Sequence, residues 1–373
     1  MLDKKEYKFW LDTIRFAAAF IVVLAHAKQW MFGDYGQLST NSHNFLIAAF
    51  YAICRIGNEA VIVFFVLSGY LVGGANINRM LINKFNFIDY LVDRFLRIYV
   101  PFIPALLFSG VIAFIFNKNV DFIAFFGNIF QLQGIFFEPF SDNGPLWSLA
   151  YECWFYVLLP VLYYLVRGNK FSLSMFFILI VFFAVFVKLD SVYLYSWLIG
   201  AVAFFNPPVK FKKHVLFLSI LLMLIGVVLI QISTASKSIV GVQFFLSNPL
   251  LGFSKIIFSA GCAFFIRIVS IAEPQSLFLA KLEHCGSYLA KFSFTLYLTH
   301  YPVIVYLSPY FKIDNGVISV YSFINLLFLI FVCVFVSYLF YYFFESKTAF
   351  YKPILKNFLL RFSINNKLLV IKN

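Results

Sequence analysis

Arg15 and His26 are two ionisable residues within the first long apolar segment of the chain, and only Ala, Ile, Val, Leu and Phe lie between them. Successive helical steps of about 100° place both side chains on one face, roughly 16 Å apart along the helix axis. A neutral imidazole can remove a proton from a hydroxyl, and an arginine binds anions. Because ionisable residues are costly inside a membrane, the spacing predicts a general base, His26, and a substrate-binding cation, Arg15. The alternatives are a histidine hydrogen-bonded at the interface and an arginine that extends toward the lipid headgroups.

The run NGPLWSLAYECWFY, at residues 143–156, predicts a turn that leads into a helix. Ser148, Glu152 and Tyr156 follow at intervals of four residues and share one face of that helix. A carboxylate inside a membrane requires a partner, so we expect Glu152 to orient the imidazole of His26 and to stabilise its protonated form. The alternative is a network of these three side chains that only locks neighbouring helices together.

Two arginines, Arg94 and Arg97, lie one helical turn apart in the run DRFLRIYVP. A guanidinium pair binds phosphate through forked hydrogen bonds, so this spacing predicts a site for a phosphorylated substrate. The competing explanation is that both arginines anchor their helix at the cytoplasmic surface.

Further polar and aromatic residues within apolar segments are candidate substrate contacts. Ser68, in the run FFVLSGY, makes a small spot that permits close approach by a helix or a ligand. Trp147 is expected to be an interfacial anchor or a wall for a sugar ring. Tyr297 and His300 lie one turn apart in the run SFTLYLTHYP, whose proline predicts a local kink. Glu59 is either a second acidic partner or a solvated interface residue.

The composition predicts which elements position these residues. Of the 373 residues, 62% are hydrophobic and 12% are charged, which is more apolar surface than a soluble fold can bury. The prediction is an all-α, polytopic integral membrane protein with about ten transmembrane helices. The five cysteines show no metal-ligand or disulfide spacing, so no metal site is expected. The segments able to span are residues 10–30, 56–76, 98–116, 145–166, 171–187, 190–205, 214–232, 250–270, 292–311 and 317–344.

Lys and Arg are distributed unevenly over the loops between these segments. If the N- and C-termini are both cytoplasmic, the cytoplasmic loops carry about three times as many Lys and Arg as the opposite loops. Topology and anionic membrane lipids then explain the net charge of +13, so no nucleic-acid partner is expected. We expect a transmembrane domain over residues 1–346 and a basic cytoplasmic tail over residues 347–373.

Taken together, the motifs resemble the membrane acyltransferase-3 family over about residues 9–346. They occur in the family's order: Arg15 with His26, FFVLSGY, RFLRIYVP, GPLWSLAYECWFY and YLTHYPV. The resemblance implies a protein that passes acyl groups, commonly acetyl from acetyl-CoA, to hydroxyls of envelope glycans, exported polysaccharides or lipids. It also implies that Arg15 and His26, and the pair Arg94 and Arg97, are the family's functional residues.

The residues and the resemblance together predict an O-acetyltransferase of the bacterial inner membrane. Acetyl-CoA, a substrate and not a bound cofactor, would enter from the cytoplasm, and the acceptor would be a glycan or a lipid-linked glycan. Tyr156, Ser148 and Tyr297 are candidate donors to the thioester oxygen. The segment ahead of FFVLSGY departs from many relatives, so no catalytic role passes to Glu59. The alternative functions are a polysaccharide polymerase and a lipid-linked sugar transporter, although a transporter should show internal repeats.

Overall fold

The computed structural model describes residues 10–167, 173–205, 212–234, 248–311 and 316–366, and these residues form helices and loops without a strand. The all-α prediction is confirmed. Residues 1–9 and the last part of the predicted tail, residues 367–373, lie outside the described residues. The helices are α1 (Leu11–Phe32), α2 (Phe45–Cys54), α3 (Gly57–Ser68), α4 (Ala75–Leu81), α5 (Phe87–Ile115), α6 (Phe122–Ile129), α7 (Leu146–Arg167), α8 (Leu173–Phe186), α9 (Ser191–Ala203), α10 (Lys212–Thr234), α12 (Pro249–Val269), α13 (Leu277–Ala290), α14 (Ser293–Leu307), α15 (Val320–Phe343) and α16 (Thr348–Asn366).

Seven helices or continuous helical runs in the described part of the chain are long and apolar enough to cross a membrane. An eighth crossing is added if α8 and α9, which meet at a bend of 110°, make one span together. α9 starts afresh after the bend because the side chain of Asp190 accepts a hydrogen bond from the backbone N–H of Val192. The predicted count of ten is not confirmed. Two of the predicted spans meet at this bend, and α14 has only 15 residues, fewer than a full crossing needs.

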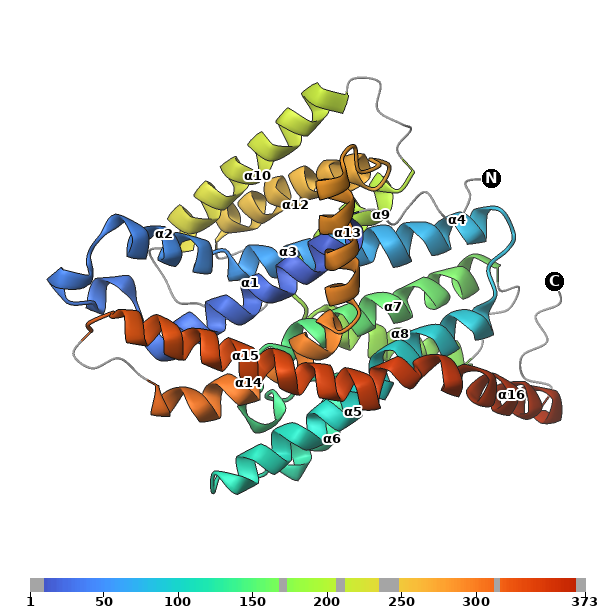
Figure 1. Cartoon of the computed structure of the whole chain (residues 1–373). Coiled ribbons are helices and arrows are strands. Elements are labelled where there is room, and N and C mark those ends of the chain that lie inside the picture. The colour runs from blue at the N-terminus through green and yellow to red at the C-terminus, as the bar shows by residue number, and fades with distance from the viewer. Residues whose placement is uncertain (1–9, 168–172, 206–211, 235–247, 312–315, 367–373) are drawn as a thin grey trace.

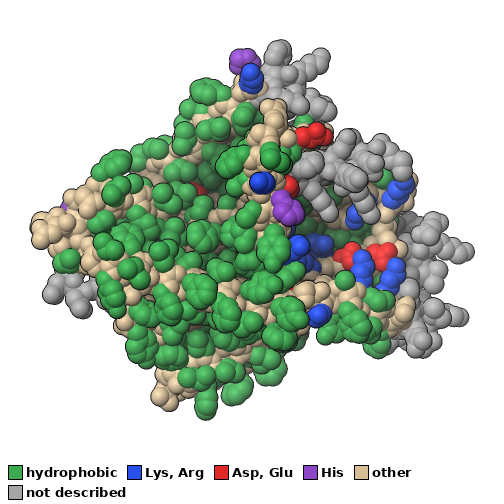
Figure 2. Space-filling view, in the orientation of Figure 1, with side chains coloured by type: hydrophobic (Ala, Val, Ile, Leu, Met, Phe, Trp, Pro, Cys, Tyr) green, Lys and Arg blue, Asp and Glu red, His purple; other side chains and the backbone are tan. Residues whose placement is uncertain are grey.

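α1 lies at the centre of the bundle and packs against α3, α13, α14 and α15 (Figure 1). α2 lies at the left of the view and α16 at the right, while α13 crosses the bundle. The face of the molecule shown in Figure 2 is mostly hydrophobic, as a surface that faces lipid requires. We call the end of the bundle that holds α4 and α16 the basic end, because Arg79, Lys84, Lys352 and Lys356 gather there.

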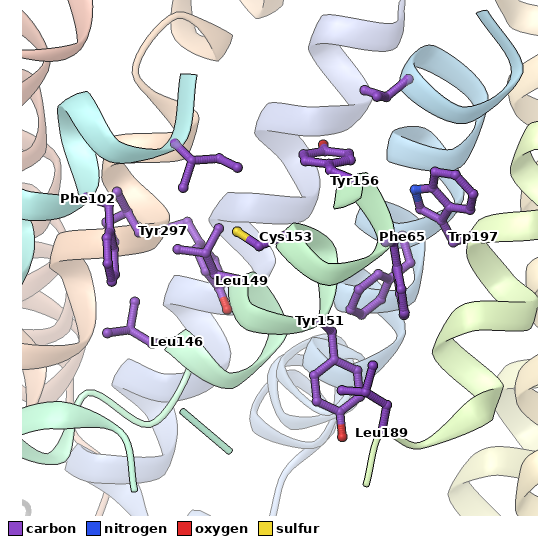
Figure 3. Close-up of a cluster of buried hydrophobic side chains, with 14 of the residues drawn as sticks. Phe65, Phe102, Leu146, Leu149, Tyr151, Cys153, Tyr156, Leu189, Trp197 and Tyr297 are labelled. Atoms are coloured by element: carbon purple, nitrogen blue, oxygen red, sulfur yellow. The ribbon is translucent and has the colours of Figure 1, made fainter. Parts of the chain in front are cut away.

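The core beside the candidate site includes side chains of α3, α7 and α9, and Figure 3 shows Phe65 and Trp197 among its buried side chains. The backbones of α3 and α9 meet at Gly69, where a Cβ atom would lie 1.9 Å from the carbonyl oxygen of Trp197. Gly69 also begins a π-helical segment, Gly69–Gly74, and such wide turns occur frequently at functional sites. Glycine therefore permits direct backbone contact next to Ser68, as the sequence predicted for this small spot.

α7 begins inside the bundle, and a buried loop ahead of it holds its first turn in place. Pro302 has no N–H to donate within α14, so the carbonyl of Leu298 lacks its usual helical partner. The side-chain amide of Asn143 donates to that carbonyl at 3.0 Å and to the Ser109 hydroxyl at 3.2 Å. Asn143 is 1% exposed. Pro302 thus leaves a free carbonyl on α14, and Asn143, in the loop ahead of α7, donates a hydrogen bond to it.

Candidate active site

A cavity of about 510 Å³ lies between α1, α3, α5, α7, α13 and α14. We call it the main cavity. It brings together residues from all five sequence motifs, although the motifs are far apart along the chain. Predicted site residues that line it are Arg15, Ser68, Arg94, Arg97, Ser148, Glu152, Tyr156 and Tyr297. The other three, His26, Trp147 and His300, are not among its lining residues.

Four cations line the main cavity, and they differ in their partners. Arg15 pairs with Asp12 at 3.0 Å, one turn earlier on α1. Arg97 pairs with the buried carboxylate of Glu345 at 2.6 Å, so the structure gives it a partner that the sequence did not indicate. Within the described residues, Arg94 and Lys291 have no carboxylate partner. These two cations therefore remain available to bind an anionic ligand.

Glu152 is the last acceptor in a chain of hydrogen bonds that crosses three helices. The indole N–H of Trp197 donates to Ser68 at 3.2 Å, Ser68 donates to the Tyr156 hydroxyl at 3.0 Å, and Tyr156 donates to Glu152 at 2.5 Å. The guanidinium of Arg94 lies over the ring of Tyr156, 5.5 Å from its centroid. The predicted alternative, a network of Ser148, Glu152 and Tyr156, is present only in part, because Tyr156 bonds to Glu152 and Ser68 whereas Ser148 bonds to Tyr297. All five of these residues line the main cavity.

The predicted pairing of Glu152 with His26 is wrong. No hydrogen bond or ion pair joins them in the described part of the chain, and Glu152 lies within electrostatic reach of Arg15 instead. The sequence argument placed Glu152 near His26 because it assumed that α7 starts at the membrane surface. α7 starts inside the bundle, so its second turn reaches the depth of Arg15, which precedes His26 by about three turns of α1.

His26 lies in an aromatic group between α1 and α14. Its ring centroid is 5.6 Å from that of His300 and 4.9 Å from that of Tyr301. The hydroxyl of Tyr301 accepts a hydrogen bond from the indole N–H of Trp30 at 3.4 Å. The structure therefore places the histidine of the first motif in ring contact with the histidine of the last motif. The order of the motifs along the chain did not predict this contact. Tyr301 was missed, although it directly follows His300 in the YLTHYP run.

Tyr297 connects the main cavity to this histidine pair. Its hydroxyl lies 2.6 Å from the hydroxyl of Ser148 and also donates to the carbonyl of Pro145. Its ring centroid lies 6.0 Å from that of His300. One aromatic ring therefore lies between the end of the cavity and the two imidazoles.

A second cavity of about 400 Å³ lies at the basic end and shares Arg94 with the main cavity. Two ion pairs connect α16 to α5 there: Lys352 with Asp93 at 2.6 Å, and Lys356 with Asp89 at 2.5 Å. These residues were not predicted as site residues. The sequence contained an indication of these ion pairs, because the two aspartates are four residues apart and so are the two lysines, which places each pair on one helix face. The segment predicted as a tail thus contributes a helix to the wall of a cavity.

Two further predicted residues lie away from both cavities. Trp147 packs against Tyr151 and Tyr193, with ring centroids 5.2 and 5.1 Å away, as part of an aromatic cluster. Glu59 is 2% exposed and accepts a hydrogen bond from the Gln231 side chain at 2.7 Å. The alternative of a solvated Glu59 at the interface is therefore wrong.

The model of the acyltransferase-3 family, described as an acyltransferase domain, matches residues 8–342. The chain belongs to the acyltransferase-3 family. The chain is also 33% identical to an uncharacterized protein of Haemophilus influenzae over 137 residues, which cover 32% of the chain and 56% of that relative. The match thus spans about half the length of the relative. No solved structure matches the chain.

The matched residues include the main cavity and the histidine pair, whereas α16 lies beyond the match. Its family and its apolar helices together make the chain a multi-pass membrane protein. In the described part of the chain, no group of three or more His, Cys, Asp or Glu side chains is arranged to hold a metal ion.

Proposed function

We propose that this acyltransferase transfers acetyl from acetyl-CoA to a hydroxyl of a cell-envelope or exported glycan, such as an O-antigen, a capsule or an exopolysaccharide. The observation that carries the proposal is the main cavity, whose wall holds cations and which is separated from the histidine pair by the ring of Tyr297. Arg94 and Lys291 provide cations without a carboxylate partner among the described residues. Tyr297, at the other end, contacts the ring of His300, which contacts the ring of His26. Cations are needed to bind a phosphorylated thioester, and an imidazole is suited to remove the proton of a hydroxyl.

In this proposal the basic end faces the cytoplasm of a bacterial cell, and the protein lies in the inner membrane. Lys and Arg side chains gather in a hollow on this side of the molecule in Figure 2, and positive residues favour the cytoplasmic side of a membrane. His26 lies about 16 Å further along α1 than Arg15. Acetyl that enters at the basic end would therefore reach His26 nearer the opposite face, where an exported glycan is accessible. A bacterial relative agrees with a bacterial source.

The second cavity is the proposed site for the nucleotide part of acetyl-CoA. Arg79 and Lys84 line it, and neither has a carboxylate partner among the described residues. Arg94 lines both cavities, so it can bind phosphate where the donor passes from one to the other. The pantetheine arm would then extend through the main cavity toward Tyr297.

The proposed reaction is a direct transfer. His26 removes the proton from the acceptor hydroxyl as the acceptor oxygen forms a bond with the acetyl carbonyl carbon. The carbon–sulfur bond of the thioester breaks, and the CoA thiolate leaves and receives the proton that His26 carried. Glu152 does not orient His26 in this scheme. Its charge lies near Arg15 and the Tyr156 hydroxyl, where it balances the cations of the main cavity.

The experiment that tests the proposal is deletion of the gene, followed by NMR of the surface polysaccharide and complementation with wild type or His26→Ala. We expect O-acetyl signals to disappear, to return with wild type and to remain absent with His26→Ala at equal protein level. His43→Ala is a matched control, because His43 is exposed and stacks on Tyr35 away from the site. Unchanged O-acetyl signals after deletion would exclude the proposed acceptor, and full activity of His26→Ala would exclude the proposed base.

A further inference from the structure

His300 carries a buried nitrogen without a hydrogen-bond partner. Its Nδ1 lies 2.9 Å from the backbone carbonyl oxygen of Leu296. A carbonyl can only accept, so Nδ1 carries the proton of the neutral ring and Nε2 presents a lone pair. His300 is 0% exposed, and Nε2 has no partner among the described residues. Because a buried polar atom normally has a partner, this lone pair indicates a group that it binds during function.

The imidazole of His26 is the candidate donor to Nε2 of His300, because the two rings are neighbours. The two ring centroids are 5.6 Å apart and the ring planes differ by 29°. No hydrogen bond joins the two rings in the structure. A linear N–H···N bond of about 3 Å between two imidazoles would bring their centroids to about 5 Å, so a small approach of the rings would form it. Such bonds are often long in ligand-free active sites and shorten when substrate binds.

We propose that His300 is a positioning residue for His26: its Nε2 accepts a hydrogen bond from a ring N–H of His26. This inference rests on the proposed role of His26 as the base. The bond fixes one tautomer of His26, so that the other ring nitrogen presents its lone pair to the acceptor hydroxyl, which replaces the Gln29 side chain as its hydrogen-bond partner. When His26 takes the proton, the same bond stabilises the imidazolium, as a hydrogen-bond acceptor behind a catalytic histidine does in general.

A neutral imidazole suits this position better than a carboxylate. Neither histidine contacts a charged side chain in the described part of the chain: the neighbours of His26 are Gln29, Tyr301 and His300. A buried carboxylate there would carry an uncompensated charge whenever His26 is neutral, which is costly in low-dielectric surroundings. A second imidazole orients His26 and adds no charge. The place that the sequence argument gave to Glu152 is thus filled by His300.

Two substitutions separate a positioning role from a packing role. His300→Gln places an amide oxygen near the position of Nε2, whereas His300→Phe keeps an aromatic ring and removes the lone pair. If His300 positions His26, His300→Phe should lower kcat by about 100-fold or more, as expected when a catalytic histidine loses its orienting partner, with KM for acetyl-CoA unchanged. His300→Gln should retain much more activity. The reverse order would overturn the proposal, because a packing site tolerates Phe better than Gln.

The tautomer of His26 gives a readout independent of activity. The chain has five histidines, so 15N-histidine labelling gives a spectrum simple enough to assign, with His26→Asn identifying the His26 signals. We expect a single neutral tautomer of His26 in wild type and His300→Gln, and a mixture in His300→Phe. An unchanged His26 spectrum in His300→Phe would overturn the proposal. If His300→Phe does not fold, His300→Asn takes its place, because its amide is too short to reach the Nε2 position.

The outcomes also distinguish this inference from the proposed function. Loss of activity in His26→Ala with full activity in His300→Phe would leave His26 as the base and remove His300 as its partner. Full activity in His26→Ala would remove the proposed base itself.

Discussion

The hydroxyl oxygens of Ser148 on α7 and Tyr297 on α14 lie 2.6 Å apart, where the main cavity comes closest to the histidine pair. Tyr297 donates its proton to the carbonyl of Pro145, so Ser148 is the donor between the two hydroxyls. Both protons are therefore engaged without a ligand. The sequence predicted Tyr297 as a donor to the thioester oxygen; in the structure its hydroxyl donates to the carbonyl of Pro145, and its ring contacts that of His300.

The ring of Tyr297 should keep water in the main cavity away from the imidazole of His26, which would otherwise activate that water for attack on the thioester. We expect Tyr297→Ala to raise hydrolysis of acetyl-CoA severalfold relative to transfer, because removal of the ring opens a passage to the histidines. Tyr297→Phe keeps the ring and should keep the wild-type ratio. Release of free thiol from acetyl-CoA, measured with and without acceptor glycan, checks the prediction. An equal ratio in both variants would show that the ring is not a barrier.

Arg94 should contribute directly to donor affinity. A charge-assisted hydrogen bond contributes about 1.5–3 kcal/mol, so we expect Arg94→Gln to weaken CoA binding by roughly 10- to 100-fold. Arg94→Lys keeps the charge without the forked geometry and should have an intermediate effect. Isothermal titration of the purified protein with CoA measures this. Arg55→Gln is the control, since Arg55 lines neither the main nor the second cavity. Unchanged affinity in Arg94→Gln would remove Arg94 from the donor site.

Arg97 should contribute to stability more than to donor affinity. Its partner Glu345 is 4% exposed and also accepts from the Thr295 hydroxyl, so Arg97→Ala leaves a buried carboxylate without its cation. We expect a loss of about 1–3 kcal/mol in stability, below the value for a fully buried pair because Arg97 is partly exposed. Thermal unfolding in detergent measures the loss.

A double substitution tests the reason for that loss. Arg97→Met together with Glu345→Leu removes both charges and should restore most of the melting temperature. Arg94→Gln, whose side chain has no carboxylate partner in the described chain, should leave the melting temperature close to that of wild type. If Arg97→Ala melts like wild type but fails to bind CoA, the arginine pair acts together on the donor, as its spacing first suggested.

Gly69 should be essential for folding. In Gly69→Ala the new methyl group would lie 1.9 Å from the carbonyl oxygen of Trp197, and a backbone atom cannot move aside as a flexible side chain can. We expect the variant to be produced in low amount or to melt well below wild type. Gly36→Ala is the control, because no atom lies within 4 Å of a Cβ at Gly36. A normal melting curve for Gly69→Ala would mean that α3 and α9 can separate.

The sequence predicted the class of fold and many members of the site. Apolar segments require a lipid environment and satisfy their backbone groups as helices, so composition was enough to predict an all-α membrane protein. The alignment of Arg15 and His26 follows from helical geometry, and both are on α1. The number of membrane crossings could not be predicted from the sequence, because an apolar run is compatible both with a straight span and with a bent pair such as α8 and α9.

Tertiary structure alone decided the partners. Local spacing fixes which side chains share a helix face, but the depth at which two helices meet depends on where each one begins inside the bundle. The buried loop held by Asn143 starts α7 inside the bundle, so Glu152 lines the main cavity with Arg15, while the ring of His26 contacts that of His300. Arg97 likewise pairs with Glu345, a residue 248 positions away. The sequence therefore determined which ionisable residues this chain places in the membrane, and packing between distant helices decided which of them lie together.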